Sequence, residues 1–401
     1  MPKLLMVTTI GGTFSFLVPF ARHFRGLGWT VDALTGPIGD DPELKAFDRV
    51  FQVPWSRNPL DPRNLAVATR RVRRVVDDGR YELVHVHTPV ASFATRFALR
   101  GRGPAGPKVV YTAHGFAFHP AGKRWPNLAF ETLERLAARW TDSLVVMNRE
   151  DAEAASRWGV LPGERIWWMP GIGVDLRGYG PGAVSAEAVR AVRAELGVGD
   201  APWFLAIAEF IPRKRHADLL RAFGRLAARP ELPPASLVLG GIGPLEPRMR
   251  ALAETLGIAS RVRFVGRRRD VPALLAAATA LVLPSQQEGL PRCVLEAMAM
   301  GLPVIGSRIR GTTELLECGA GFLYELGDVA ALAGLLERVL LDPAAASAAA
   351  RRARERIAAY AEEKVVALHE ALYAQALASA TAPAPAPAPG AEPGRPALRS
   401  A

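Results

Sequence analysis

The chain has 401 residues, 49% of them hydrophobic and 22% charged, which indicates a folded protein of more than one domain and excludes a disordered chain. Its two cysteines, Cys293 and Cys318, argue against a disulfide framework and for a reducing compartment. The net charge of +11 suits nucleic acid, anionic lipid or an anionic small molecule, and an Arg- and Ala-rich composition bias accounts for it equally well.

The first residues, 1–14, contain no apolar core followed by a cleavage site, so we expect no signal peptide. No run reaches about 18 uninterrupted apolar residues, so no transmembrane helix is expected either. The sequence also has no zinc-finger spacing, no helix-turn-helix signal and no aromatic RNA-binding motif. These absences favour a cytoplasmic protein that does not bind nucleic acid.

Short apolar runs alternate with amphipathic runs through the first half of the chain. Helices are expected between the apolar runs, including ones over 62–78 and 124–140. Apolar strands interleaved with helices indicate βα units and a parallel sheet covered on both faces. The expected strands are 3–10, 29–36, 49–54, 82–88, 108–115, 143–148 and 165–171.

The alternation pauses at the Gly/Pro-rich stretch 170–185, which is the best candidate for a linker between domains. A second series of strands and helices follows it, so the chain repeats the same architecture. The expected strands of this series are 204–210, 236–243, 262–266, 280–285 and 303–308.

We therefore predict an α/β protein of two doubly wound, Rossmann-like domains facing each other across a cleft, with domain boundaries at 1–180 and 181–360. A helix over 361–378 is expected to pack back on the first domain. The Pro/Ala-rich segment 379–401 is predicted to be disordered. Ligands of open parallel sheets bind beyond the carboxyl ends of the strands, so side chains at strand ends are the candidates for function.

In the first domain, Gly11, Gly12 and Thr13 follow the first strand, where glycines let a backbone approach a ligand and a helix start favours anions. A plain tight turn explains the same pattern. His114 ends the strand 108–115 and could bond a sugar or phosphate oxygen or transfer a proton, or it could simply cap a turn. His87 is a weaker candidate of the same kind.

In the second domain, Arg213 and Lys214 stand between a strand end and a helix, where they would neutralise a diphosphate, unless they belong to a solvated run of charge. Glycine-rich turns recur after the next strands. The residues of these turns that we expect at the donor are Gly241, Gly243, Val265 and Gly266.

The stretch 284–316, PSQQEGLPRCVLEAMAMGLPVIGSRIRGTTELL, carries two glutamates eight positions apart. Glu288 follows a strand and could bond sugar hydroxyls, and Gly289 and Leu290 offer backbone N–H groups before a helix. Glu296 lies about two helical turns further on, which would place it on the same face, where it could accept from the two hydroxyls of a ribose. A solvent-facing helix residue is the alternative for Glu296.

This stretch resembles the E-x7-E signature of retaining glycosyltransferase family 4, whose members have the GT-B fold. The segment 240–285 resembles the part that precedes the signature in that family. In the first half, VHVHTPVASFATRFA, YTAHGFAFH, TDSLVVMNREDAEAA and PGIGVDL are similar to the capsule and exopolysaccharide branch. The resemblance covers roughly residues 3–375, and the motif at 284–307 is its specific part.

The resemblance implies transfer of a sugar from a nucleotide donor with retention of configuration, without a metal or other cofactor. By matching positions, Glu288 would contact the donor sugar, Glu296 the ribose, and Lys214 the leaving diphosphate. His114 would face the donor sugar. Gly11 and Gly12 would match the acceptor-side loop.

The chain departs from the family at one position. Many members carry Gly-Arg-Leu where this sequence reads Ala-Glu-Phe at 208–210, so Glu209 replaces a phosphate-binding arginine. Either Arg213 supplies the charge or the donor is handled differently.

Two segments combine basic residues with apolar or aromatic ones, as proteins do at an anionic membrane surface. The first, 63–81, has its valines beside a cluster of arginines, although those valines could equally face the domain core. The second is 118–130. The membrane-surface candidates are Arg70, Arg71, Arg73, Arg74, Lys123, Arg124 and Trp125.

We therefore predict a retaining glycosyltransferase at the inner face of the plasma membrane. It would transfer a sugar from a UDP-sugar to a polyprenyl-diphosphate-linked or glycan acceptor. The alternatives are a nucleotide-sugar-binding protein without turnover, a nucleotide-sugar epimerase, and a transferase with a soluble acceptor.

Overall fold

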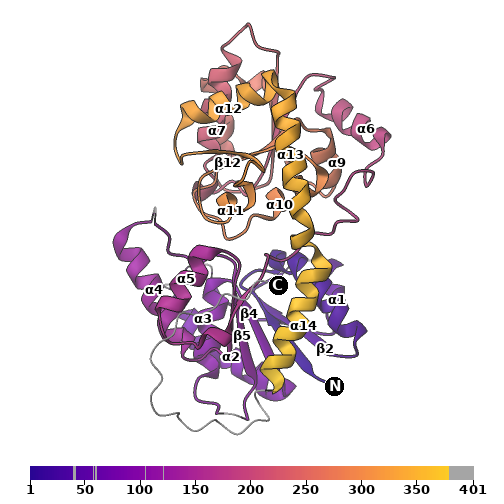
Figure 1. The fold of residues 1–401 in the computed structure, drawn as a ribbon. Coiled ribbons are helices and arrows are strands. Elements are labelled where there is room, and N and C mark those ends of the chain that lie inside the picture. Colours follow the sequence, from indigo (N-terminus) through magenta and orange to yellow (C-terminus); the bar gives the residue numbers. More distant parts are fainter. Residues whose placement is uncertain (39–41, 57, 59–60, 104, 121, 379–401) are drawn as a thin grey trace. The chain divides into compact units, whose positions relative to one another are not determined.

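The computed structural model describes residues 1–38, 42–56, 58, 61–103, 105–120 and 122–378. The chain divides into two units (Figure 1). Unit 1 comprises Met1–Met169 together with the chain from Val366 onward, and unit 2 comprises Pro170–Val365. The boundary falls between residues 169 and 170, at the start of the Gly/Pro-rich stretch. The predicted disorder of 379–401 concerns residues outside the described part of the chain.

Unit 1 contains a seven-stranded parallel sheet with the order β3-β2-β1-β4-β5-β6-β7. The order reverses between β1 and β4, which is the point where ligands bind in such sheets. The strands are β1 Lys3–Val7, β2 Thr30–Thr35, β3 Val50–Gln52, β4 Leu83–His87, β5 Lys108–Ala113, β6 Ser143–Val146 and β7 Ile166–Trp168.

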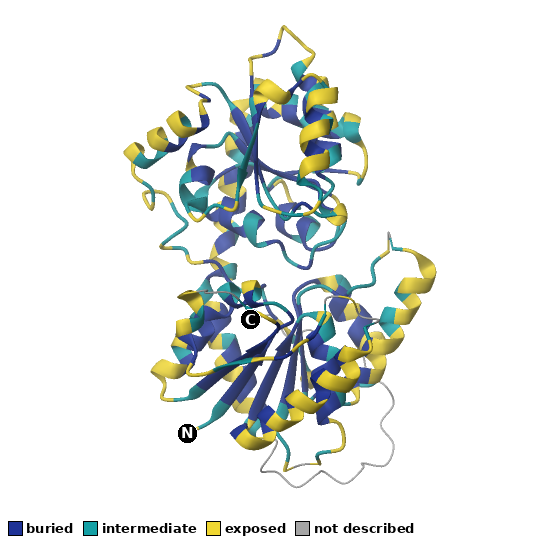
Figure 2. Ribbon diagram, turned by 180° about the vertical axis from the view of Figure 1, so that it is seen from behind, coloured by how far each residue is buried: buried dark blue, intermediate teal, exposed yellow. Residues whose placement is uncertain are grey.

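Helices cover both faces of this sheet, and the central strand β4 is buried along its whole length (Figure 2). Buried strands and exposed outer helix faces are what a doubly wound fold requires. The helices are α1 Val18–Gly26, α2 Arg63–Gly79, α3 Pro89–Leu99, α4 Arg124–Ala138 and α5 Arg149–Arg157, with short 3-10 turns η1 Gly11–Phe16, η2 Pro42–Ala46 and η3 Gly163–Arg165.

The last helix, α14 (Glu362–Ala378), completes unit 1 although it follows unit 2 in the sequence. Its Tyr373 is fully buried, and the ring centroid lies 4.9 Å from that of Phe24 in α1. His369, one helical turn earlier, packs against Phe20 with centroids 4.4 Å apart. Figure 1 shows α14 in yellow beside α1. The core of unit 1 therefore depends on the C-terminal helix.

Unit 2 contains a six-stranded parallel sheet with the order β10-β9-β8-β11-β12-β13, which reverses between β8 and β11. The two doubly wound domains expected from the sequence are thus confirmed. The strands are β8 Trp203–Ile207, β9 Ser236–Gly240, β10 Val262–Gly266, β11 Ala280–Leu283, β12 Val304–Ser307 and β13 Phe322–Tyr324.

The helices of unit 2 alternate with its strands, as βα units require. They are α6 Ala186–Leu196, α7 His216–Ala227, α8 Glu246–Thr255, α9 Val271–Ala277, α10 Arg292–Met300, α11 Thr312–Leu316, α12 Val329–Leu341 and α13 Pro343–Ile357, with 3-10 turns η4 Pro212–Lys214, η5 Ala259–Arg261 and η6 Ala358–Tyr360.

The two stretches of chain at the ends of unit 2 pair with each other. Val174 donates its N–H to the carbonyl of Tyr360 at 2.9 Å, and its own carbonyl accepts from the N–H of Glu362 at 3.0 Å. Gly173 stands beside this bridge with φ +82°, where a Cβ would lie 2.7 Å from the Cα of Glu362. The bridge therefore needs a glycine at 173.

No helix within the described residues is long and apolar enough to cross a lipid bilayer.

Candidate active site

Lys214 and Glu288 form an ion pair at the carboxyl edge of the second sheet. Lys214 ends η4, after β8, and Glu288 follows β11, the neighbouring strand at the switch point. The Lys214 Nζ donates to Glu288 Oε1 at 2.5 Å, and the two side chains are only 16% and 12% exposed. A cation and a carboxylate thus stand together where the fold class binds its ligands.

The backbones on either side of this pair are also joined. The N–H of Gln286 donates to the carbonyl of Arg213 at 2.7 Å, so the loops after β8 and β11 hold each other. The Arg213 residue itself is exposed. Glu209, two residues after β8 ends, is half-buried. A cation at 213 is therefore free to reach an anionic ligand.

The loop that carries Glu288 is held from a third direction by the segment between β12 and α11. Arg310 is 8% exposed, and its Nε donates to the Glu288 carbonyl at 3.2 Å. Gly311 follows with φ +73°, where a Cβ would lie 2.0 Å from the carbonyl oxygen of Gly289. Leu290 is half-buried against the core of unit 2. The position of residues 288–290 is thus set by close backbone packing.

Glu296 is buried in α10 rather than exposed to solvent. Only 6% of the residue is accessible, and Arg292 Nε donates to its Oε1 at 2.7 Å. Burial raises the pKa of the Glu296 carboxyl, while the charge of Arg292 and a hydrogen bond from the Tyr179 hydroxyl lower it. The predicted helical relation to Glu288 is wrong, because α10 begins at Arg292 and Glu288 lies in the loop before it.

The glycines at 241 and 243 are needed by the backbone around them. A Cβ would lie 2.1 Å from the Ala208 carbonyl oxygen at the first and 2.7 Å from the Phe210 backbone at the second, and φ is +140° and +157°. The Gly241 N–H donates to the carbonyl of Gly266 at 2.7 Å. Val265 is half-buried in β10. These residues hold together the loops after β8, β9 and β10, with or without a ligand.

In unit 1, the candidate histidines meet at the carboxyl ends of β4 and β5. His87 Nδ1 lies 3.0 Å from His114 Nε2, and His87 is 2% exposed while His114 is half-buried. Burial lowers the pKa of both rings, to about 4 for His114. The neighbouring His85 is buried in the core, where it hydrogen-bonds Tyr373 and Thr112. Both candidates are therefore neutral near pH 7.

The glycine-rich turn after β1 is a 3-10 turn. Gly11 is buried, and a Cβ there would lie 2.4 Å from the Ile38 side chain, which would have to move to admit it. Gly12 is exposed with no neighbour within 4 Å of a Cβ. The N–H of Thr13 closes the turn on the Ile10 carbonyl at 3.2 Å. Of the three, Gly12 has the open surroundings that a ligand would need.

The two membrane-surface candidates differ in the structure. In α2, the apolar face is used by the core, because Val72, Val75 and Val76 are buried there and the arginines at 70, 71, 73 and 74 lie on the exposed face. The idea that these valines meet a membrane is therefore wrong. Trp125 in α4 is 73% exposed beside Lys123 and Arg124, which are also exposed.

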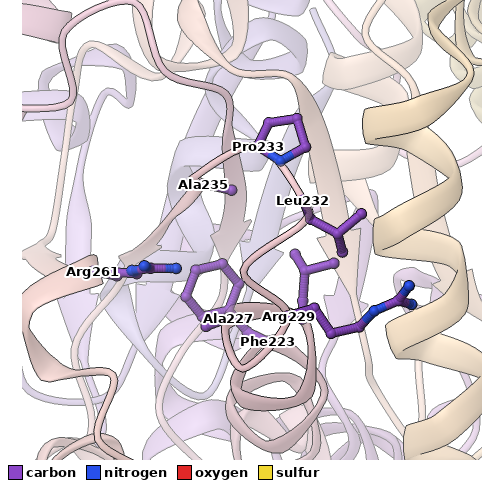
Figure 3. A pocket seen from close by; sticks show the side chains of 8 residues that line it. Phe223, Ala227, Arg229, Leu232, Pro233, Ala235 and Arg261 are labelled. Atoms are coloured by element: carbon purple, nitrogen blue, oxygen red, sulfur yellow. The ribbon is translucent and has the colours of Figure 1, made fainter.

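Within the described residues, no group of three or more His, Cys, Asp or Glu side chains is arranged to hold a metal ion. One small cavity of about 10 Å³, room for no more than a water molecule, lies near the amino ends of β9 and β10 (Figure 3). It is at the opposite edge of the sheet from Lys214 and Glu288. Its lining residues are Phe223, Leu226, Ala227, Arg229, Leu232, Pro233, Ala235 and Arg261.

Comparison with known proteins identifies the family of the chain. Residues 11–170 match the family described as Glycosyl transferase 4-like domain, and residues 190–363 match Glycosyl transferases group 1. EpsD of Bacillus subtilis, named as a glycosyltransferase, is 33% identical over 372 residues, which cover 91% of this chain and 94% of EpsD. The chain belongs to the family 4 glycosyltransferases.

A second relative names a UDP-sugar and a diphosphoundecaprenol-linked sugar, and a solved structure shares the fold. The UDP-Gal:alpha-D-GlcNAc-diphosphoundecaprenol alpha-1,3-galactosyltransferase of Escherichia coli is 30% identical over 266 residues, covering 66% of this chain and 67% of that enzyme. The structure of Anabaena HepE in complex with UDP and glucose has a TM-score of 0.78 at 21% identity, covering 94% of this chain and all of HepE. The HepE likeness shows that this glycosyltransferase has the GT-B fold.

Three residues of the candidate site were missed by sequence reasoning: Arg292, Tyr179 and Arg310. Arg292 stands four positions before Glu296 in a helix, and that spacing was a usable signal for an ion pair. Tyr179 and Arg310 gave no such signal, because their contacts depend on how separate loops meet.

Proposed function

We propose that the protein is a retaining, metal-independent glycosyltransferase that uses a UDP-sugar. The Lys214–Glu288 ion pair at the switch point of the second sheet is the observation that carries the proposal. The galactosyltransferase from Escherichia coli takes a UDP-sugar by its name, and HepE was solved with UDP, which supports the same nucleotide here.

The mechanism follows from the charges at the site. As the bond from the sugar to the diphosphate breaks, negative charge grows on the phosphate oxygens, and Lys214 and Arg213 stabilise it. Glu288 releases Lys214 when the diphosphate enters and accepts from hydroxyls of the sugar. The acceptor oxygen bonds to the anomeric carbon on the face that the phosphate leaves, and its proton passes to that phosphate, so the configuration is retained. Glu296 accepts from the ribose hydroxyls.

The acceptor we propose is a sugar on a polyprenyl diphosphate, or a glycan, in the assembly of a surface polysaccharide. The name of the Escherichia coli relative, which includes a diphosphoundecaprenol acceptor, supports this class. An acceptor anchored in lipid requires the enzyme to reach a membrane surface.

The α4 helix provides a surface of the right kind. Its exposed apolar side chains recur every three to five residues, and exposed basic residues accompany them, a combination that binds anionic interfaces. We expect the wild-type protein to bind liposomes that contain anionic lipid, and the Trp125→Glu variant to remain in solution. Substitution of Arg70 in α2 is the control with a smaller effect. The apolar residues are Trp125, Leu128, Leu133 and Leu136, exposed by 73%, 52%, 41% and 38%.

The test of the function is release of nucleoside diphosphate from UDP-, GDP- and ADP-sugars with bacterial polyprenyl-linked lipid extract added. We expect release from one UDP-sugar, dependent on the lipid and lost in Lys214→Ala and Glu288→Ala. Anomeric analysis of the product decides retention, and chelation with EDTA decides metal dependence. Release from a GDP-sugar alone would overturn the choice of nucleotide.

A second candidate is a protein that binds a nucleotide sugar without transferring it. The carboxylate of Glu209 at the end of β8, where many family members carry an arginine, favours this reading. It predicts that UDP binds but no donor turns over, and that Glu209→Arg restores turnover. An epimerase would instead convert the donor sugar without any acceptor, which chromatography of the donor pool would detect.

A further inference from the structure

His87 and His114 form an unusual pair at the carboxyl ends of two adjacent strands. In the register of β4 and β5, His87 lies opposite Thr112, and His114 is two residues further along. His87 Nδ1 and His114 Nε2 are 3.0 Å apart, with ring centroids at 5.3 Å. The two rings are therefore directly hydrogen-bonded to each other.

The backbone on either side of this pair is firmly held. Thr88 has φ +66°, a strained conformation for a β-branched residue, and its hydroxyl accepts the N–H of Thr9 at 2.9 Å. On the other strand, the N–H of Phe116 donates to Asp151 Oδ2 at 3.1 Å. Strain retained in this way is common at functional positions.

Only one proton can lie between the two rings. Burial keeps both imidazoles neutral, and a neutral imidazole carries one N–H, on either Nδ1 or Nε2. Either His87 donates from Nδ1, or His114 donates from Nε2. This choice determines whether Nδ1 of His114 carries a proton or a lone pair.

The other nitrogen of His87 decides between these arrangements. His87 Nε2 is buried and has no hydrogen-bond partner within the described residues. If His114 were the donor, the proton of His87 would sit on that Nε2 as a buried N–H with no acceptor, which proteins avoid more strictly than an unfilled acceptor. If His87 donates from Nδ1, the buried Nε2 carries only a lone pair.

We infer that His87 is a positioning residue that holds His114 in the tautomer with its proton on Nδ1. Nδ1 of His114 makes no hydrogen bond within the described part of the chain, and His114 is half-buried, whereas His87 is fully buried. It is then an N–H donor for an oxygen of a substrate bound at this edge of the first sheet, and not a general base. This role in binding rests on the proposed function, whereas the tautomer does not.

The tautomer can be measured directly by long-range 1H–15N correlation spectra of the full chain labelled with 15N-histidine. We expect the His114 ring, assigned through His114→Gln, to carry its proton on Nδ1 at pH 7. A spectrum with the His114 proton on Nε2 would overturn the inference, without any variant of His87.

Two variants of His87 separate positioning from packing. His87→Asn places an amide N–H near the position of Nδ1, and His87→Leu fills a similar space without a donor. We expect the His87→Asn variant to keep the His114 tautomer and the His87→Leu variant to lose it. The rate of UDP release from UDP-galactose or UDP-glucose should fall about tenfold more in His87→Leu than in His87→Asn. Equal losses in both variants would show that His87 serves only packing.

His23→Asn is the control. His23 lies in α1 and is partly exposed, with Glu370 at 2.5 Å, so its loss should leave the His114 tautomer and the turnover unchanged. His114→Leu tests the binding role of His114 separately from the tautomer that His87 sets. If it turns over like the wild type while the tautomer is as inferred, the role of His114 in substrate binding fails and the positioning by His87 stands.

Discussion

Replacement of Gly311 by alanine tests whether packing of the loop 288–290 controls catalysis. Gly311 has φ +73°, and an added Cβ would lie 2.0 Å from the carbonyl oxygen of Gly289. To reach even the shortest tolerated contact of 3.0 Å, the two backbones would have to separate by about 1 Å. A shift of that size at a reacting group costs about 100-fold in rate.

Gly257 is a control for an alanine placed at a positive φ without a clash. Its φ is +69°, and nothing lies within 4 Å of an added Cβ. Alanine at a positive φ costs about 1–2 kcal/mol of stability. Gly311, with φ +73° and ψ −53°, lies outside the αL well, so its backbone strain exceeds this cost. Gly311→Ala adds an overpacking cost of about 1–3 kcal/mol because backbone must move.

The assay combines urea unfolding with UDP release at saturating donor. We expect Gly257→Ala to lose about 1–2 kcal/mol of stability and keep wild-type turnover. Gly311→Ala should lose more stability and about 100-fold in turnover. Equal stability losses, with turnover kept in both, would refute the view that Gly311 positions Glu288 by direct backbone contact.

Three further predictions concern charges and hydrogen bonds. Lys214→Met and Glu288→Gln should each lose about 1–3 kcal/mol of stability and abolish UDP release. The double variant should lose less stability than the two single losses added together. Additive losses would contradict a coupled pair. Tyr179→Phe removes a hydroxyl that donates to Glu296, so calorimetry should find UDP binding about five- to tenfold weaker, and unchanged binding would exclude this role. Burial, with the Lys214 charge second, lowers the pKa of His216 to about 4. In the unfolded chain, His216 takes up its proton near pH 6.5, whereas in the folded protein it stays neutral down to about pH 4. The free energy of unfolding is therefore at its full value above pH 6.5 and decreases as the pH falls toward 4. Between pH 7.5 and 5, urea unfolding should show the wild type losing about 2 kcal/mol more than His216→Phe, and parallel profiles would disprove the assignment.

Much of the fold followed from the sequence because parallel strands buried on both faces are continuous apolar runs. The strand β4, LVHVH, is buried at every position and was expected. The shortest strand of unit 2, β13 (Phe322–Tyr324), was not expected. A strand end can be located from the sequence, so Lys214 and Glu288 were expected at the same edge of the sheet.

Contacts between loops could not be predicted in the same way. Arg310 and Tyr179 reach their partners from segments more than 20 residues away in the chain, and no spacing rule relates them. The face of α2 was ambiguous for a different reason. An apolar stripe beside arginines is compatible with a helix that faces a core and with a helix that faces a membrane. The burial of Val72 and its neighbouring valines shows that the stripe of α2 faces the core.

The contribution of α14 to unit 1 has a consequence for how the chain is made. Ribosomes release a protein from its amino terminus, and domains usually fold as soon as they emerge. Unit 1 lacks Leu372 and Tyr373, both fully buried in its core, until the last helix has been synthesised. We therefore expect unit 2 to fold first on the ribosome while the earlier half waits, and a nascent chain stopped before Val366 to remain sensitive to protease in residues 1–169.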